Sequence, residues 1–146
     1  LRFFNVYGPE QRLDSNYGAV VPIFIDRFTQ GMQPTIYGSG KQSRDFVNVR
    51  DVSRLLVDLS IGEWAQPKQS VYNVGTGQSV TITELASLIH ELSQSNLAFE
   101  PSFQTQRAGD IEHSVASIEA IRRDFNWKPE ISLENGLREL IEVDSS

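Results

Sequence analysis

The sequence contains no cysteine among its 146 residues. Disulfide bonds, thiolate catalysis and most structural zinc sites are therefore excluded. Two widely spaced histidines, His90 and His113, do not replace the missing thiolates as metal ligands, so we expect no metal site. The sequence also lacks an apolar run long enough to cross a bilayer or to serve as a signal segment. These absences favour a cytoplasmic protein with no membrane partner.

Positive charge is scarce as well. The sequence has 13 Lys and Arg against 19 Asp and Glu, which gives a net charge of −6. An anionic ligand would therefore have to be held by a few converging cations and not by the overall field, and we expect no nucleic-acid partner. With 39% apolar and 22% charged residues, the composition is that of a packed globular protein.

The first residues read as a strand. Residues 1–9 form an aromatic and β-branched run that ends in Gly8-Pro9, which predicts a buried strand beginning at the first residue. The run is not preceded by an initiating methionine. Because a buried strand needs neighbours on both edges, we expect this chain to be the C-terminal piece of a longer polypeptide.

Short strands and amphipathic helices are mixed along the rest of the chain. A capping-box pattern at Thr81 and Glu84 marks one helix start, and apolar residues at i, i+3, i+4 and i+7 mark helical stripes. The mixture, with short connections and no internal repeat, predicts a single α/β unit. The predicted strands are 35–37, 45–49, 71–74 and 97–99. The predicted helices are 21–30, one with a stripe of Val52, Leu55, Leu56 and Leu59, one that follows Thr81 with Leu85, Leu88, Ile89 and Leu92, and two capped by Ser117 and Ser132.

Two arginines, Arg44 and Arg107, each lie in a polar, glycine-containing loop beside a carboxylate. The planar guanidinium offers two parallel hydrogen bonds and keeps its charge, which suits a phosphate. Two such groups from separate loops would grip a diphosphate. Either loop alone could instead hold a surface Arg–Asp ion pair, which contributes about 0–1 kcal/mol to stability. The spacing does not decide between a phosphate site and such an ion pair.

Three further polar residues, Asn5, His90 and His113, lie outside the two arginine loops. Asn5 interrupts an apolar strand and needs hydrogen-bond partners when it is buried. It could contact a ligand, because open parallel sheets bind ligands at their strand ends, or it could tie two loops together. We expect His90 to be a solvated residue on a helix surface, and His113, next to the Arg107 loop, to be a loop residue that forms a hydrogen bond and not a catalyst.

Three patterns resemble known motifs without matching them. Tyr37 and Lys41 have the spacing of a Tyr/Lys catalytic pair, but the glycines between them make a helix improbable. Residues 75–77 begin like a dinucleotide fingerprint but lack its third glycine. Gly40 and Lys41 are followed by glutamine, not by serine or threonine, which excludes a P-loop.

Four blocks of the sequence are informative when taken together and in order: residues 1–9, 37–46, 72–75 and 107–110. They resemble the C-terminal portion of extended short-chain dehydrogenases, the NAD-dependent nucleotide-sugar epimerase/dehydratase family. The resemblance runs from residue 1 to about 137 and is nearest to the UDP-sugar 4-epimerases. It implies an α/β fold in which 1–16 are the last strand and loop of the Rossmann cofactor domain and 17–146 are the substrate-binding domain.

The resemblance also implies roles for individual residues. Part of the set would face NAD and the larger part would face the nucleotide sugar. It places Phe3 and Phe4 beside the nicotinamide, Asn5 on the diphosphate, Val20, Val21 and Pro22 along the sugar and uridine, Ile36 and Tyr37 beside the uracil, Arg44 and Arg107 on the diphosphate, and Asp110 on the ribose hydroxyls.

The activity implied for the whole protein is NAD-dependent epimerisation at C4 of a UDP-sugar, in an enzyme expected to be a homodimer. Such enzymes move a hydride from C4 to NAD and return it to the other face, with a Tyr/Lys pair handling the proton. Neither that pair nor the glycine-rich fingerprint stands in this sequence, so we expect the chain alone to be inactive. A 4,6-dehydratase or decarboxylase of the same family, and a non-catalytic nucleotide-sugar binding module, remain alternatives.

Overall fold

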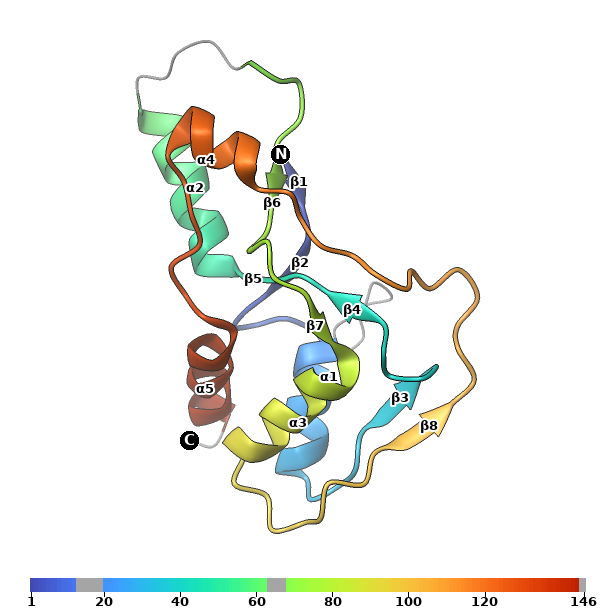
Figure 1. The fold of residues 1–146 in the computed structure, drawn as a ribbon. Coiled ribbons are helices and arrows are strands. Elements are labelled where there is room, and N and C mark those ends of the chain that lie inside the picture. Colours follow the sequence, from blue (N-terminus) through green and yellow to red (C-terminus); the bar gives the residue numbers. More distant parts are fainter. Residues whose placement is uncertain (13–19, 63–67, 145–146) are drawn as a thin grey trace.

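The computed structural model describes residues 1–12, 20–62 and 68–144. These form short strands and helices in a mixed α/β arrangement, as predicted (Figure 1). None of the helices described is both long and apolar enough to cross a membrane. The elements are β1 (Arg2–Phe3), β2 (Asn5–Tyr7), α1 (Val20–Thr29), β3 (Thr35–Tyr37), β4 (Ser43–Arg44), β5 (Phe46–Asn48), α2 (Val49–Ile61), β6 (Asn73–Val74), β7 (Val80–Thr81), α3 (Ile82–Leu92), β8 (Ser102–Gln104), α4 (Glu119–Phe125) and α5 (Leu133–Asp144).

The opening run is divided into two strands because it changes partner at Phe4. β1 pairs in parallel with β6, and the Phe4 N–H donates to the carbonyl of Val74 at 3.0 Å. The next residue, Asn5, donates its N–H to the carbonyl of Asp45 at 3.0 Å, and β2 pairs in parallel with β5. The predicted burial is wrong for the first half of the run, since Phe3 is 45% exposed.

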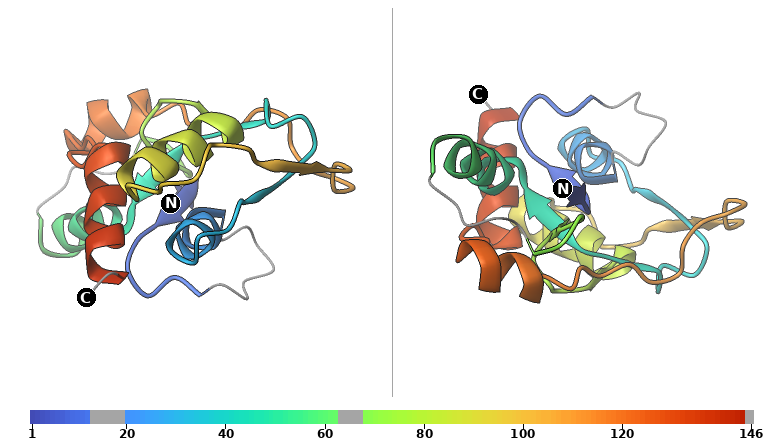
Figure 2. Two further views of the ribbon diagram at one scale, coloured as in Figure 1. Left: turned by 90° about the horizontal axis from the view of Figure 1, so that it is seen from below. Right: turned by 90° about the horizontal axis from the view of Figure 1, so that it is seen from above.

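The other described strands form two further pairs. β3 pairs in parallel with β8, and β4 pairs antiparallel with β7. The predicted strand at 97–99 is wrong, because the strand forms at Ser102–Gln104, whose residues are all exposed. Its position is set by pairing with β3 and not by an apolar pattern. Figure 2 shows β3, β8 and the chain after β8 extending to one side, away from the helices.

One hydrophobic core lies among α1, α3 and α5. α1 packs against α3, and α3 packs against α5. Gly136 lets α5 approach the end of β2, because a Cβ at that position would lie 2.2 Å from the hydroxyl oxygen of Tyr7. The buried residues of this core are Tyr7, Val21, Phe24, Ile25, Phe28, Ile36, Phe46, Ile82, Leu85, Ala86, Ile89, Leu137 and Ile141.

A second core lies between α2 and α4, around β5 and β6. Phe4 and Val6 pack against it, so the opening strands share a core with residues from much later in the chain. The predicted boundary between residues 16 and 17 falls outside the described residues and stays a prediction. The buried residues of the second core are Val47, Val52, Leu55, Tyr72, Val74, Ala116, Ile118, Ile121 and Trp127.

Side-chain caps fix where two helices begin. The Asn48 side chain accepts a hydrogen bond from the N–H of Arg50 at 2.9 Å, so α2 starts at Val49, one residue inside the strand predicted there. The capping box predicted at α3 is confirmed. The N–H of Glu84 donates to the Thr81 hydroxyl at 3.1 Å, and the Glu84 carboxylate accepts from the N–H of Thr81 at 2.8 Å.

Three local predictions have mixed outcomes. Ser132 does cap α5, since its hydroxyl accepts from the N–H of Asn135 at 3.2 Å. Ser117 does not cap α4, because Ile118 occupies the N-cap position and no side chain caps the helix. Leu56, predicted in the buried stripe of α2, is 45% exposed. The stripe that packs on the core is therefore narrower than the sequence spacing indicates.

His90 is not the solvated surface residue that was expected. Its ring lies at the end of α3 between two phenylalanines, with centroid distances of 5.2 Å to Phe28 and 5.5 Å to Phe99. Its Nε2 is 2.8 Å from the carbonyl oxygen of Leu97. The expectation is wrong because the segment after α3 folds back over the imidazole and half-buries it.

Acid should weaken the fold through Asp124 at the end of α4. Its carboxylate accepts hydrogen bonds from Arg123 at 2.8 Å and from the Tyr72 hydroxyl at 2.8 Å, and the Arg123 bond is the main cause that lowers its pKa from 3.8 to about 2. A lowered pKa stabilises the fold above pH 3.8, and that contribution is lost as the pH falls towards 2. Between pH 3.8 and pH 2, the free energy of unfolding measured with urea should fall less steeply for Asp124→Asn than for the wild-type protein. Equal slopes for both proteins would contradict the role of Asp124.

Candidate functional site

The structure brings the two arginine loops together. Nη2 of Arg44 forms an ion pair with Oδ1 of Asp110, and Nη1 donates to the carbonyl of Ser43 at 2.8 Å. The side chains of the ion pair are 14% and 23% exposed, so the pair is partly shielded from water. The partner of Arg44 is thus a carboxylate of the distant loop and not its sequence neighbour Asp45. An arginine has more N–H donors than these two bonds use, which leaves donors for an anion.

Asp45 points away from Arg44 into the interior, as successive residues of an extended segment do. It is fully buried, and its carboxylate accepts from the N–H groups of Thr76 at 2.7 Å, Gly77 at 2.9 Å and Ala116 at 3.1 Å. Two N–H groups of the glycine-containing turn at 75–77 therefore donate to a carboxylate of the protein itself. This explains why the turn is not a phosphate-binding fingerprint.

Ser43 joins β4 to the segment that follows Asp110. Its N–H donates to the carbonyl of Glu112 at 2.8 Å, and its carbonyl accepts from the N–H of Ser114 at 3.1 Å. Its hydroxyl is 3.1 Å from Nδ1 of His113, so the loop hydrogen bond predicted for this histidine is confirmed. Ser43 itself was missed by the sequence analysis, because no periodicity or motif separates it from the other serines.

Arg107 lies over an aromatic ring. Its guanidinium carbon is 4.1 Å from the centre of the Tyr37 ring, a cation–π distance. The carbonyl of Arg107 accepts from the N–H of Asp110 at 3.2 Å, closing a turn in which Gly109 has a φ of 78°. One loop therefore presents Asp110 to Arg44 and Arg107 to Tyr37.

Asn5 lies next to this region. It pairs with Phe46 in the register of β2 and β5, and its N–H donates to the carbonyl of Asp45, the residue after Arg44. Its side chain is half-buried and forms no hydrogen bond with the described residues. Asn5 is thus positioned next to β4, and its amide has no hydrogen-bond partner among the described residues.

The residues predicted to line the sugar and the base lie deeper. Val21 is 2% exposed and Ile36 is fully buried, and both belong to the core among the helices. Val20 and Pro22 are half-buried. A ligand beside Val21 or Ile36 would meet their backbone, because their side chains are turned into the core. Their ligand contacts stay predictions.

Phe3 and Phe4, both predicted to lie beside the nicotinamide, differ in how far they are exposed. Phe3 keeps 45% of its surface exposed, so its ring is available to a flat apolar partner such as a nicotinamide. Phe4 packs against the core between α2 and α4 and is half-buried. Within the described parts of the chain, no group of three or more His, Asp or Glu side chains could hold a metal ion.

Tyr37 and Lys41 do not share a helix face. Tyr37 ends β3, and Gly38 and Gly40 between the two residues have φ values of 81° and 75°. These left-handed conformations exclude a helical turn there. The dismissal of a Tyr/Lys catalytic pair at this position is confirmed.

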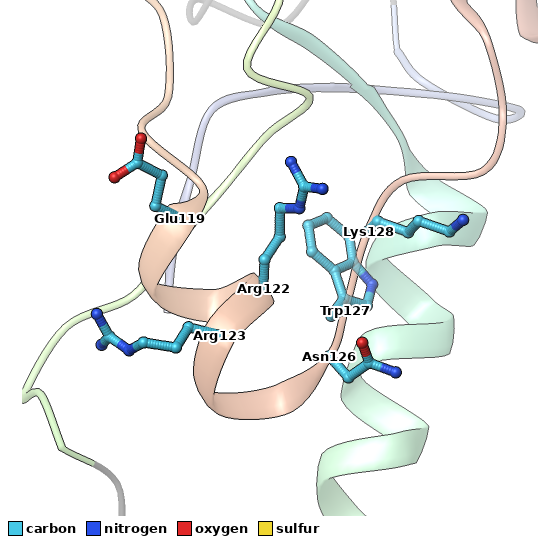
Figure 3. A pocket seen from close by; sticks show the side chains of 6 residues that line it. All are labelled: Glu119, Arg122, Arg123, Asn126, Trp127 and Lys128. Atoms are coloured by element: carbon cyan, nitrogen blue, oxygen red, sulfur yellow. The ribbon is translucent and has the colours of Figure 1, made fainter.

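A separate hollow lies at the end of α4 (Figure 3). Three exposed cations gather there, but Arg123 is already bonded to Asp124 at 2.8 Å. The hollow contains none of the residues predicted to bind a ligand. It is lined by Glu119, Arg122, Arg123, Asn126, Trp127 and Lys128.

Comparison with known proteins identifies the family. The model of the NAD dependent epimerase/dehydratase family matches residues 1–75. The chain belongs to this family. The resemblance inferred from the four sequence blocks is therefore confirmed.

Two solved members of the epimerase/dehydratase family have closely similar folds. A UDP-glucose 4-epimerase from Thermotoga maritima, solved with UDP-glucose, is 33% identical with a TM-score of 0.86, and the match covers 99% of this chain and 44% of that one. A UDP-N-acetylglucosamine 4-epimerase from Methanobrevibacter ruminantium, in complex with UDP-N-acetylmuramic acid, is 34% identical with a TM-score of 0.86 and coverages of 99% and 46%.

A relative with a different activity is equally similar in sequence. UDP-glucuronic acid decarboxylase 1 of Xenopus tropicalis is 36% identical over 140 residues, which are 96% of this chain and 31% of the decarboxylase. The chain spans less than half the length of the curated relatives that it matches.

Proposed function

We propose that this chain holds the nucleotide of a UDP-sugar in an NAD-dependent 4-epimerase, so that C4 of the sugar faces the nicotinamide. The observation that carries the proposal is the junction of Arg44 with the loop of Arg107 and Asp110. In a protein with a net charge of −6, this junction places two guanidinium groups on adjoining segments. Such an arrangement suits two linked phosphates.

The proposed contacts follow from the positions of the side chains. Arg44 and Arg107 bind the diphosphate, with Arg107 leaving the face of Tyr37 to reach it. Asn5 adds its side-chain amide. Asp110, already fixed by Arg44, accepts from the ribose hydroxyls. Val20, Val21, Pro22, Ile36 and Tyr37 border the sugar and the uracil.

The nucleotide lies far from the reacting carbon, so its binding can contribute to catalysis only by positioning the sugar. Energy from the diphosphate and the base can be used to orient the sugar against the cofactor. NAD, when bound, supplies the hydride acceptor, and Phe3 and Phe4 would lie beside its nicotinamide. Since the chain has no Tyr/Lys pair on a helix, we expect it to bind a UDP-sugar without turning it over, and we expect the whole enzyme to be a homodimer.

A decarboxylase or 4,6-dehydratase is the second candidate activity. The decarboxylase relative, at 36% identity, is as similar to this chain as the epimerases are. For each of these activities we propose the same contacts to the nucleotide, with the difference at the sugar. A non-catalytic module would share the grip as well. The nucleotide-binding role is therefore the part of the proposal to test first.

Isothermal titration calorimetry with a panel of nucleotide sugars tests this role. We expect UDP-glucose and UDP-N-acetylglucosamine to bind more tightly than dTDP-glucose or GDP-mannose, because Ile36 and Tyr37 are proposed to border the uracil. Glucose 1-phosphate, which lacks the nucleotide, is the control and should not bind measurably. Tightest binding by UDP-glucuronic acid would favour the decarboxylase. Absence of binding by every UDP-sugar would overturn the proposal.

A further inference from the structure

We propose that His113 is a positioning residue for the diphosphate: through Ser43 it holds Arg44 in place to bind the nucleotide. The inference rests on the proposed function and adds a residue to it. His113 itself contacts no ligand in this proposal. It acts on the guanidinium through a buried serine.

The carbonyl of Ser43 is the point through which His113 acts. That oxygen accepts from the N–H of Ser114 at 3.1 Å and from Nη1 of Arg44 at 2.8 Å. The Ser43 N–H and hydroxyl are both bonded to the same segment, to the carbonyl of Glu112 and to Nδ1 of His113. A shift of residues 112–114 would therefore move the oxygen that orients Arg44.

The second nitrogen of Arg44 is held by the same stretch of chain. Asp110, which pairs with Nη2, lies just before residues 112–114. Among the described residues, the side-chain contacts between β4 and this stretch are the Arg44–Asp110 pair and the Ser43–His113 bond. The Ser43–His113 bond is therefore the second side-chain contact that holds β4 against the segment carrying Asp110.

Ser43 and His113 differ in exposure, and this difference allows a positioning role of His113 to be distinguished from a general structural one. Ser43 is 6% exposed, whereas 67% of the His113 side chain is in contact with solvent. Removing an exposed ring costs little packing energy. Loss of the Nδ1 contact should therefore alter the site more than it alters the stability of the fold. The other ring nitrogen, Nε2, lies 4.0 Å from the carboxylate of Glu112, which is also exposed.

The test compares His113→Ala and His113→Asn by their affinities for UDP and for uridine. We expect His113→Ala to bind UDP about tenfold more weakly, the effect of misplacing one charge-assisted hydrogen bond, with uridine binding and the melting temperature nearly unchanged. Asparagine places an amide close to the position of Nδ1, so His113→Asn should recover most of the UDP affinity. UDP is measured by calorimetry and uridine by ligand-observed NMR.

His90→Ala is the matched control. His90 also bonds to a neighbouring part of the chain, through Leu97, but it packs between Phe28 and Phe99 away from Arg44. This variant should lower the melting temperature and leave the ratio of UDP to uridine affinity unchanged.

The outcomes separate this inference from the proposed function. If wild-type protein and His113→Ala bind UDP equally while Arg44→Ala does not bind it, the role of His113 is overturned and the proposed function stands. An equal loss of UDP and uridine binding, or no recovery with His113→Asn, also overturns the role. If the wild-type protein does not bind UDP, the proposed function fails and this inference fails with it.

Discussion

Replacing Arg44 by alanine is expected to weaken the binding of a UDP-sugar by at least about tenfold. Charge-assisted hydrogen bonds contribute about 1.5–3 kcal/mol each, and 1.4 kcal/mol corresponds to a factor of about ten in affinity. Arg44 is only 14% exposed, so its bonds to a phosphate would be poorly screened by water. The substitution also leaves Asp110 without its ion-pair partner, which places an unpaired negative charge beside the diphosphate. Calorimetry with UDP-glucose measures the change.

Two further variants define the cause of that loss. Arg44→Lys keeps the charge but loses the planar fork, so we expect it to recover only part of the affinity. Arg50→Ala removes an arginine whose partner is Glu139 in an ion pair that is 59% and 50% exposed, and it should leave binding unchanged. Wild-type affinity in both Arg44→Ala and Arg107→Ala would reject the assignment of the diphosphate to these loops.

Both arginines could be identified as candidates from the sequence, but the carboxylate that pairs with Arg44 could not. Arg44 and Arg107 are recognisable from a charge of fixed geometry in a polar loop, which is local information. That Arg44 is held by Asp110 depends on how β4 lies against the segment after β8, and no spacing encodes this. The same reason explains why Ser43 was missed. Its importance comes from three contacts with residues about seventy positions later.

The accuracy of the fold prediction follows the same division. Helix α3 was predicted correctly because Thr81 and Glu84 act within one turn. Strand β8 was placed wrongly because its three exposed residues become a strand only by pairing with β3. The burial of β1 was wrong for a similar reason, since the chain changes from one partner strand to another at Phe4. Strands of two or three residues carry too little periodicity to define themselves.

Replacing Asp45 by alanine is expected to cause the largest loss of stability. The carboxylate is fully buried and accepts from the backbone N–H groups of Thr76, Gly77 and Ala116. Each N–H left without an acceptor in the interior costs about 1–3 kcal/mol, so the free energy of unfolding should fall by about 3 kcal/mol or more. Urea denaturation followed by circular dichroism measures this change.

The Asp45 prediction has both a graded variant and a control. Asp45→Asn keeps one acceptor oxygen but sets a donor NH2 against other donors, so its loss should lie between those of wild type and Asp45→Ala. Glu134→Ala removes a carboxylate that is 56% exposed and pairs with Arg138 along α5, and it should change stability by less than about 0.5 kcal/mol. Wild-type stability in Asp45→Ala would mean that the turn at 75–77 and the segment at Ala116 do not depend on this carboxylate. In that case the fixed placement of β4, on which the orientation of Arg44 rests, would need another source.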